Sequence, residues 1–289
     1  MSTRALNTCS ILPALLACLA ATSAITALPA QTAAAQQVWR EYPGIEGRWY
    51  GNGEIQTGQQ RMSEFIVGRL MFPQARRGYA LGTGGGDWLR GGTAWTVDYP
   101  EGDRRFAELL GRLTTIDVRA VEQPVNLDDD IDAYYWPFLI SGLVGAWDLT
   151  DAQALKLRDY LLRGGFLLCD SFYGSVEWQG FVAGMSRVFP DRPIVDLPDT
   201  HSIFHTVYDL NEPPQIPTWQ HLPHGYRNDG AKAHWRAILD DDGRVMVMIA
   251  FNNDIADGWQ RADDAGYPAE PAAMAIRLGV NFAMYALTH

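Results

Sequence analysis

LGTGGGDW, residues 81–88, is the stretch around which the rest of the chain is organised. An apolar run typical of a β-strand, residues 64–72, precedes it, and the first clear amphipathic helix begins at Asp103. Consecutive glycines allow positive φ angles and a close approach of the backbone to a ligand or to another segment. A loop at this place in an α/β sheet is where ligands usually bind. The sequence therefore predicts a site here, but it does not specify a reaction.

Beyond this loop, helical patterns recur at regular intervals. Thr150 with Gln153 three residues later predicts a capping box, and the helix that it opens is expected to end at Gly164. Ser175 is expected to cap a further helix, and residues 271–287 form a last helix that is apolar on most faces.

Between these helices lie short apolar runs that are typical of buried strands. Strands are predicted over residues 115–121, ending before Pro124, and over residues 137–142, 166–169 and 193–197. The sequence DDDG at residues 240–243 predicts a hairpin between residues 235–239 and 244–251. The alternation predicts one α/β domain over residues 64–289, with a mainly parallel sheet, helices on both faces and a C-terminal antiparallel hairpin.

The N-terminus is typical of a cleavable signal peptide over residues 1–35. One basic residue, Arg4, precedes an apolar run at residues 11–27, and three alanines at residues 33–35 fit a cleavage site. The apolar core is shorter than the ~20 residues that a membrane span needs, and Cys18 only weakly resembles a lipoprotein site. The mature protein is expected to be periplasmic or secreted, with an irregular arm over residues 36–63.

Charge and cysteine content restrict the partners of the mature chain. Removal of the leader takes away Arg4, Cys9 and Cys18, which leaves 22 basic and 34 acidic residues, a net charge of −12, and Cys169 as the one cysteine. No intrachain disulfide can then form. No basic patch is apparent, and no later stretch is long and apolar enough to cross a bilayer, so neither nucleic acid nor a membrane span is expected.

Several pieces of the sequence together resemble a bacterial family known as domain of unknown function 4159. They are GGDW (85–88), WTVDYP (95–100), LLRGGF (161–166), VFPDR (188–192), HSIFH (201–205) with VYD (207–209), and RLGVN (277–281). The resemblance covers nearly all of the mature chain. It implies a flavodoxin-like domain similar to class I glutamine amidotransferases and trehalose-utilisation-like proteins, and it implies no established activity.

Class I glutamine amidotransferases place a nucleophilic cysteine on a tight elbow after a strand, with a His-Glu pair elsewhere. Cys169 ends a predicted strand, but Leu167 and Ser171 stand where such an elbow needs glycine, and no His-x-Glu occurs in the chain. Burial would raise the pKa of the thiol and silence it. Ser171 also lacks the Gly-x-Ser-x-Gly surroundings of a serine nucleophile. We therefore expect the Cys-His-Glu set to be absent.

Acidic and amide side chains follow several of the predicted strands, and Asp87, Asp98 and Asp170 are candidate catalytic residues. Asn252, Asp254 and Asp257 reach the same rim only if residues 244–251 run parallel to their neighbour. Grouped carboxylates can act as acid and base or bind a hard cation; alternatively, they cap helices and brace loops. The candidate ligand-binding set is Gly85, Gly86, Asp87, Trp88, Asp98, Asp170, Asn252, Asp254 and Asp257.

His201 and His205 are weak metal candidates, because a spacing of four would place them on one helical face. No His-Glu-x-x-His is present, and the glycine run matches neither a P-loop nor a dinucleotide fingerprint. The sequence assigns no cofactor.

Two functions remain open at this point. The first is an exported ligand-binding or envelope-assembly domain that lacks the amidotransferase nucleophile, with a small molecule, a glycan or other envelope proteins as partners. The alternative is a hydrolase of glycan or cell-envelope fragments that works through aspartate carboxylates, with or without a metal.

Overall fold

The computed structural model describes residues 40–45, 65–75 and 86–289, which all belong to one compact unit, Gln37–His289. The predicted leader, most of the predicted arm and Gly85 lie outside the described residues. The strands are β1 (Gly68–Met71), β2 (Gln123–Asn126), β3 (Phe138–Gly142), β4 (Phe166–Asp170), β5 (Val195–Asp196), β6 (His234–Leu239) and β7 (Val245–Phe251). The α-helices are α1 (Glu101–Leu113), α2 (Asp151–Leu162), α3 (Gly174–Val188), α4 (Ile255–Gln260) and α5 (Ala269–Thr288).

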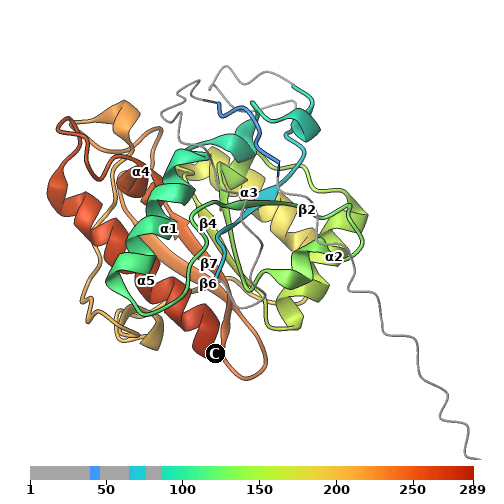
Figure 1. Ribbon diagram of the computed structural model, residues 1–289. Helices are drawn as coiled ribbons and strands as arrows, with labels where there is room; N and C mark the ends of the chain where they lie inside the picture. Colours follow the sequence, from blue (N-terminus) through green and yellow to red (C-terminus); the bar gives the residue numbers. More distant parts are fainter. Residues whose placement is uncertain (1–39, 46–64, 76–85) are drawn as a thin grey trace, which may run out of the picture. The chain divides into compact units, whose positions relative to one another are not determined.

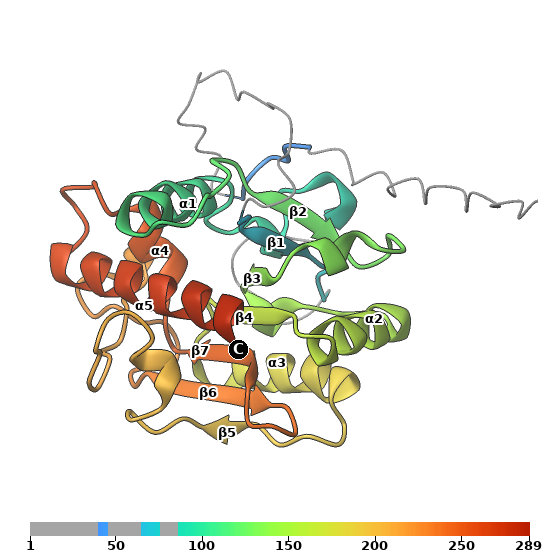
Figure 2. The ribbon, with the colours of Figure 1, turned by 60° about the horizontal axis from the view of Figure 1, so that its bottom comes forward.

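The strands of the described residues form one seven-stranded sheet in the order β2-β1-β3-β4-β7-β6-β5 (Figures 1 and 2). The first five strands in this order are parallel, and β6 is antiparallel to both β7 and β5. The predicted hairpin joins β6 to β7, and Gly243 takes a φ of 85° in its turn. The prediction of a mainly parallel sheet with an antiparallel hairpin is confirmed.

Helices cover both faces of the sheet, which explains why the central strands are apolar along their whole length. Helices α2 and α3 lie on one face and α1, α4 and α5 on the other (Figure 2). Side chains of the first pair pack in one apolar cluster and those of the other three helices in a second. Within β4, Leu167 and Cys169 face the first cluster, whereas Phe166 and Leu168 face the second. This alternation fixes the register of β4 between its neighbours, and hence the position of the residues at its end.

The capping box of α2 is confirmed, since Gln153 N donates to Thr150 Oγ1 over 3.2 Å and Thr150 N donates to Gln153 Oε1 over 3.0 Å. The strand predicted over residues 115–121 is wrong. That segment contributes one isolated parallel bridge, Val118 to Phe65, and β2 begins later and contains Pro124. Proline is tolerated there because β2 is an edge strand, where one side of the backbone has no neighbour.

The start of α3 also differs from the prediction, because Tyr173 and not Ser175 is the N-cap residue. Gly174, with a φ of 78°, makes the turn into the helix. The first N–H groups of α3 are capped by side chains of other segments. Gly174 N donates to Asn252 Oδ1 over 2.8 Å, and Ser175 N donates to Asp229 Oδ1 over 2.7 Å. Acceptors from distant loops therefore replace the local cap that the sequence indicates.

Candidate functional site

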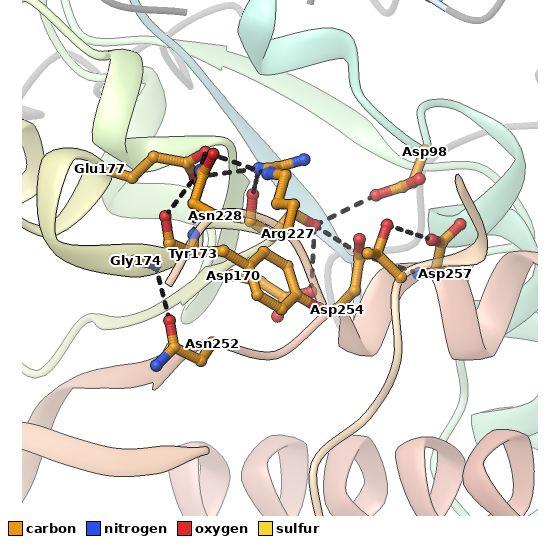
Figure 3. A network of polar contacts seen from close by, with 12 residues as sticks. Asp98, Asp170, Tyr173, Gly174, Glu177, Arg227, Asn228, Asn252, Asp254 and Asp257 are labelled. Carbon is orange, nitrogen blue, oxygen red and sulfur yellow. Dashed lines mark hydrogen bonds and ion pairs between the residues drawn. The ribbon is translucent and has the colours of Figure 1, made fainter. Parts of the chain in front are cut away.

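Three loops meet at the carboxyl edge of the parallel strands. Asp170 is the last residue of β4, and the segment that carries Asp254 and Asp257 follows β7 directly. Since β7 pairs parallel with β4, both loops leave the sheet at the same edge. Asp98 comes from the loop between β1 and α1, and Figure 3 shows it facing the other acids. The sequence placed Asn252, Asp254 and Asp257 at this edge only if residues 244–251 run parallel to their neighbour, and β7 does run parallel to β4.

Sharp backbone turns set the direction of these loops. Leu143, Ser171 and Asn252 immediately follow β3, β4 and β7, and their φ angles are 48°, 58° and 62°. Asp98 has a φ of 55°. Non-glycine residues rarely take such left-handed conformations, which cost of order 1–3 kcal/mol each and cluster at functional sites. Three neighbouring strands of the sheet thus end in a strained turn at the same edge.

The Ser171 hydroxyl lies between three carboxylates. Its Oγ is 2.7 Å from Asp254 Oδ1, 3.3 Å from Asp98 Oδ2 and 3.5 Å from Asp170 Oδ2. A hydroxyl has one proton to donate, and the shortest contact is the one to Asp254. Ser171 itself is completely buried. It therefore acts as a polar link that holds the acids of three loops together.

A cavity of about 150 Å³ opens against this cluster. Its walls combine acidic, amide, hydroxyl, guanidinium and apolar groups: Ile45, Val97, Asp98, Thr218, Gln220, Arg227, Asp254 and Asp257. One carboxylate oxygen from each of the three aspartates lies within 4.8 Å of the others. The described residues thus place three buried acids around one small, polar space.

Burial raises the pKa of Asp170, Asp254 and Asp257, and repulsion from a neighbouring acid adds to the shift of the last two. Burial raises the pKa of Asp254, and the charge of Asp170 raises it further. Burial and then the charge of Asp254 likewise raise the pKa of Asp257. Burial also raises the pKa of Asp170, although backbone N–H groups of Ile255 and Ala256 oppose that shift. A positive charge in the cavity would favour the ionised form of all three.

Among the described residues, the charges of Arg69, Arg227 and Arg261 act on the cluster, and each arginine has an acidic partner, which for Arg69 is Asp103. Arg227 donates from Nε and Nη2 to the two carboxylate oxygens of Glu177, both over 3.0 Å, and from Nη2 to the carbonyl oxygen of Ser171 over 2.8 Å. Arg261 Nε lies 3.1 Å from Asp257 Oδ1. Asp257 Oδ2 accepts from Trp219 N over 2.7 Å. The arginines thus fix the loops of the rim while matching only part of its negative charge.

The structure divides the predicted ligand-binding residues into two groups. Asp98, Asp254 and Asp257 line the cavity, and Asp170 lies directly behind them against Ser171. Asn252 braces the surrounding chain, because its Oδ1 caps α3 and its Nδ2 donates to the carbonyl oxygen of Lys232 over 2.6 Å.

The last glycine of the triglycine run and the two residues after it have other surroundings. Gly86 is exposed, and Asp87 is an exposed N-cap whose Oδ1 accepts from Leu89 N over 3.1 Å. Trp88 is half-buried, and its carbonyl oxygen accepts from Trp95 Nε1 over 2.8 Å. Gly86, Asp87 and Trp88 do not line the cavity. Gly85 falls among the residues that are not described.

The two candidate metal histidines have local partners. His201 Nδ1 accepts from Ile203 N over 3.2 Å, and His205 contacts the Asp209 carboxylate and, over 2.8 Å, the carbonyl oxygen of Asp199. The hydrogen bond with the Asp199 carbonyl, and then that with the Asp209 carboxylate, raise the pKa of His205. Over residues 40–45, 65–75 and 86–289, the one group of three potential metal ligands is Asp98, Asp254 and Asp257.

The thiol of Cys169 is completely buried in β4. Burial raises its pKa well above the usual value, and the neighbouring charge of Asp170 adds to the shift. A thiol in this environment stays protonated, and only the thiolate is a good nucleophile.

Sequence reasoning missed Thr218, Gln220 and Arg227, which reach the cavity from the long segment between β5 and β6. That segment is rich in proline and histidine and has no periodicity that would place its side chains. The sequence did contain one usable signal of buried acids. Arg69 lies inside the apolar β1, and a charge within a buried strand needs an acidic partner.

No helix of the described residues is long and apolar enough to span a membrane. A family model described as a domain of unknown function (DUF4159) matches residues 83–287. No curated protein matches the chain.

Proposed function

Because the chain belongs to the DUF4159 family, whose description names no activity, we propose a function from the site itself: an exported domain that binds a small ligand in the carboxylate cavity. The observation that carries this proposal is the cavity of about 150 Å³, lined by Asp98, Asp254 and Asp257 from two separate loops. Burying several acids beside one another is costly, and such groups cluster at ligand and active sites.

The strand order supports a flavodoxin-like fold similar to that of class I glutamine amidotransferases. Counted through the parallel strands, the order β2-β1-β3-β4-β7 corresponds to the flavodoxin-like order, whose ligands bind outside the carboxyl ends near the switch between β1 and β3. Asp98 follows β1 and lines the cavity at that edge. The proposed site is therefore where this topology favours one.

The environment of Cys169 supports binding without thiol chemistry. The buried, protonated thiol faces an apolar cluster and does not line the cavity. A domain of amidotransferase-like fold without its nucleophile would keep the ligand-binding edge and lose acyl transfer. The signal-like residues 1–35 support a periplasmic or secreted location, where a small molecule, a glycan or another envelope protein would be the partner.

The test is a thermal-shift panel on the purified protein. Monosaccharides, amino acids, amines and divalent chlorides are added singly at matched ionic strength, and the proposal expects at least one to raise the melting temperature. Asp254→Asn should remove that shift, whereas the exposed Asp242→Asn, in the hairpin at the far end of β7, should keep it. Equal shifts in both variants would contradict binding at the cavity.

A hydrolase of glycan or cell-envelope fragments is the second candidate, and the Ser171 contacts favour it. Three carboxyl groups within 3.5 Å of one hydroxyl provide both a proton acceptor for an attacking water and a proton donor for a leaving group. Release of reducing sugar or of amine from purified peptidoglycan fragments, abolished in a folded Asp170→Asn variant, would establish this reading over simple binding.

A further inference from the structure

We infer that Asp98, Asp254 and Asp257 form a binding site for one hard divalent cation. The inference rests on the proposed function, since it names the ligand class of the same cavity.

The oxygen spacing suits a single ion. One oxygen of each aspartate lies within 4.8 Å of the other two. Oxygens on opposite sides of a bound Ca²⁺ are about 4.6–5.2 Å apart, twice the metal–oxygen distance, and those around Mg²⁺ are somewhat closer. One ion can therefore contact all three carboxylates after small side-chain movements. Oxygen ligands without sulfur or imidazole favour Mg²⁺, Ca²⁺ or Mn²⁺ over zinc.

The cavity leaves space for the rest of the coordination sphere. Hard cations need six to eight oxygens and usually keep water among them. The cavity of about 150 Å³ is several times the ~30 Å³ that one water occupies in the liquid. Thr218 and Gln220 also line it and offer a hydroxyl and an amide oxygen.

The charges around the cavity leave an excess of acid. Glu177 pairs with Arg227. Asp257 shares Arg261 with Asp264, whose Oδ2 lies 3.7 Å from Arg261 Nη1. Asp170 and Asp254 form no ion pair with any described residue, and the charges of Arg69 and Arg227, which act on them from a greater distance, are already paired with Asp103 and Glu177. A divalent cation would supply the missing positive charge.

An unpartnered oxygen behind the cluster points to the same ligand. Asp170 is completely buried, and its Oδ1 has no hydrogen-bond partner among the described residues. Its carboxyl group adjoins the cluster, because Ser171 Oγ contacts Asp170, Asp98 and Asp254 together. A buried carboxylate oxygen without a partner is costly, and a nearby cation lowers that cost.

The test is a titration of the chelator-treated protein with MgCl₂, CaCl₂ and MnCl₂ by isothermal calorimetry, with NaCl at matched ionic strength as the blank. One equivalent of at least one divalent ion should bind and raise the melting temperature. Asp254→Asn and Asp257→Asn should each weaken that binding by about tenfold or more, and Asp242→Asn should leave it unchanged. Circular dichroism identifies any variant that does not fold, and Asp98→Asn then takes its place.

The outcomes separate this inference from the proposed function. Binding of a sugar, amino acid or amine without binding of any divalent ion would overturn the cation site and leave the ligand-binding proposal standing. Cation binding of equal strength in Asp254→Asn and Asp257→Asn would also overturn it, because the ion would lie elsewhere. The absence of every ligand would overturn both proposals.

Discussion

Asp103 and Asp254 are both buried aspartates of the same domain, but their surroundings differ. Asp103, on α1, accepts from Arg69 Nε over 2.9 Å and from Arg69 Nη2 over 2.5 Å, and both side chains are completely buried. Asp254 contacts the Ser171 hydroxyl and the backbone N–H of Asp257 and has no such arginine. The first acid joins α1 to β1, whereas the second faces a cavity.

A second pair follows the pattern of Asp103. Glu122 is buried and lies 2.8 Å from Arg104 Nε. Asp103 and Glu122 are thus each matched by an arginine of the chain itself. The acids at the carboxyl edge of β4 and β7 are incompletely matched, which is what a site that receives a cation from solution requires.

The largest effect is expected from breaking the matched pair. Arg69→Met should lower the free energy of unfolding by about 3–5 kcal/mol, because it leaves the Asp103 carboxylate buried without a counter-charge. Urea unfolding followed by tryptophan fluorescence measures this loss. The double variant Arg69→Met with Asp103→Leu should recover much of it, and a loss below about 1 kcal/mol in the single variant would remove the contrast between the two regions.

A buried acid outside both regions sharpens the comparison through pH. Burial raises the pKa of Asp132 to about 6, the hydrogen bond from Trp136 opposes the shift, and the charge of Asp129 reinforces it. Because the folded-state pKa lies above the unfolded value, this group contributes stability at low pH, and the contribution is lost as pH rises through about 6. Between about pH 4 and pH 7 the loss should reach about 2–3 kcal/mol.

Asp132→Asn should flatten that part of the stability–pH curve, as measured by urea unfolding at a series of pH values. An unchanged slope would show that burial alone does not determine the behaviour of these acids. The difference between Asp103 and Asp254 would then depend on the cavity beside Asp254 and not on the absence of a paired arginine.

Neutralising an acid of the cavity should stabilise the folded protein, whereas breaking the Arg69–Asp103 pair should destabilise it. In the presence of chelator at pH 8, Asp254→Asn should raise the free energy of unfolding by about 1–2 kcal/mol, because one of several repelling buried charges is removed while an acceptor for Ser171 remains. Asp103→Asn, the matched substitution in the paired region, should destabilise. Destabilisation of similar size by both would mean that Asp254 is a structural acid like Asp103.

The smallest effect is expected at the loop after the triglycine run. Asp87→Ala should cost no more than about 0.5–1 kcal/mol, because the residue is an exposed cap of a short 3-10 helix. The Kd of any cation or small molecule that binds in the cavity should stay within twofold of the value for the parent protein in the same calorimetric titration. Loss of binding would move the functional site back to residues 81–88.

The fold was largely predictable because its signals are local. The capping box at Thr150, the apolar run of β3 and the DDDG hairpin each depend on a few neighbouring residues. The edge strand β2 was missed, because the tolerance for Pro124 depends on its place in the sheet and not on its neighbours in the chain.

The site was predictable only in part. Asp98, Asp254 and Asp257 could be proposed because each lies in a loop that follows a parallel strand. The path of the segment that carries Thr218 and Arg227 is set by distant contacts, such as those of Gln215 Nε2 with the carbonyl oxygen of Asn252 and of Tyr267 with that of Pro217. No local pattern encodes such contacts, so the acidic half of the cavity was accessible from the sequence and the other half was not.

The left-handed residues Leu143, Ser171 and Asn252 have a consequence for how this rim can diversify. They direct three adjacent strands into their loops through main-chain torsion, before any side chain of the loop makes a contact. Asp254 and Asp257 also hold their loops through hydrogen bonds, so an exchange at either position keeps the path of the chain only if it keeps an acceptor, as asparagine does. The same scaffold can accept a redesigned recognition surface, with new selectivity introduced one residue at a time.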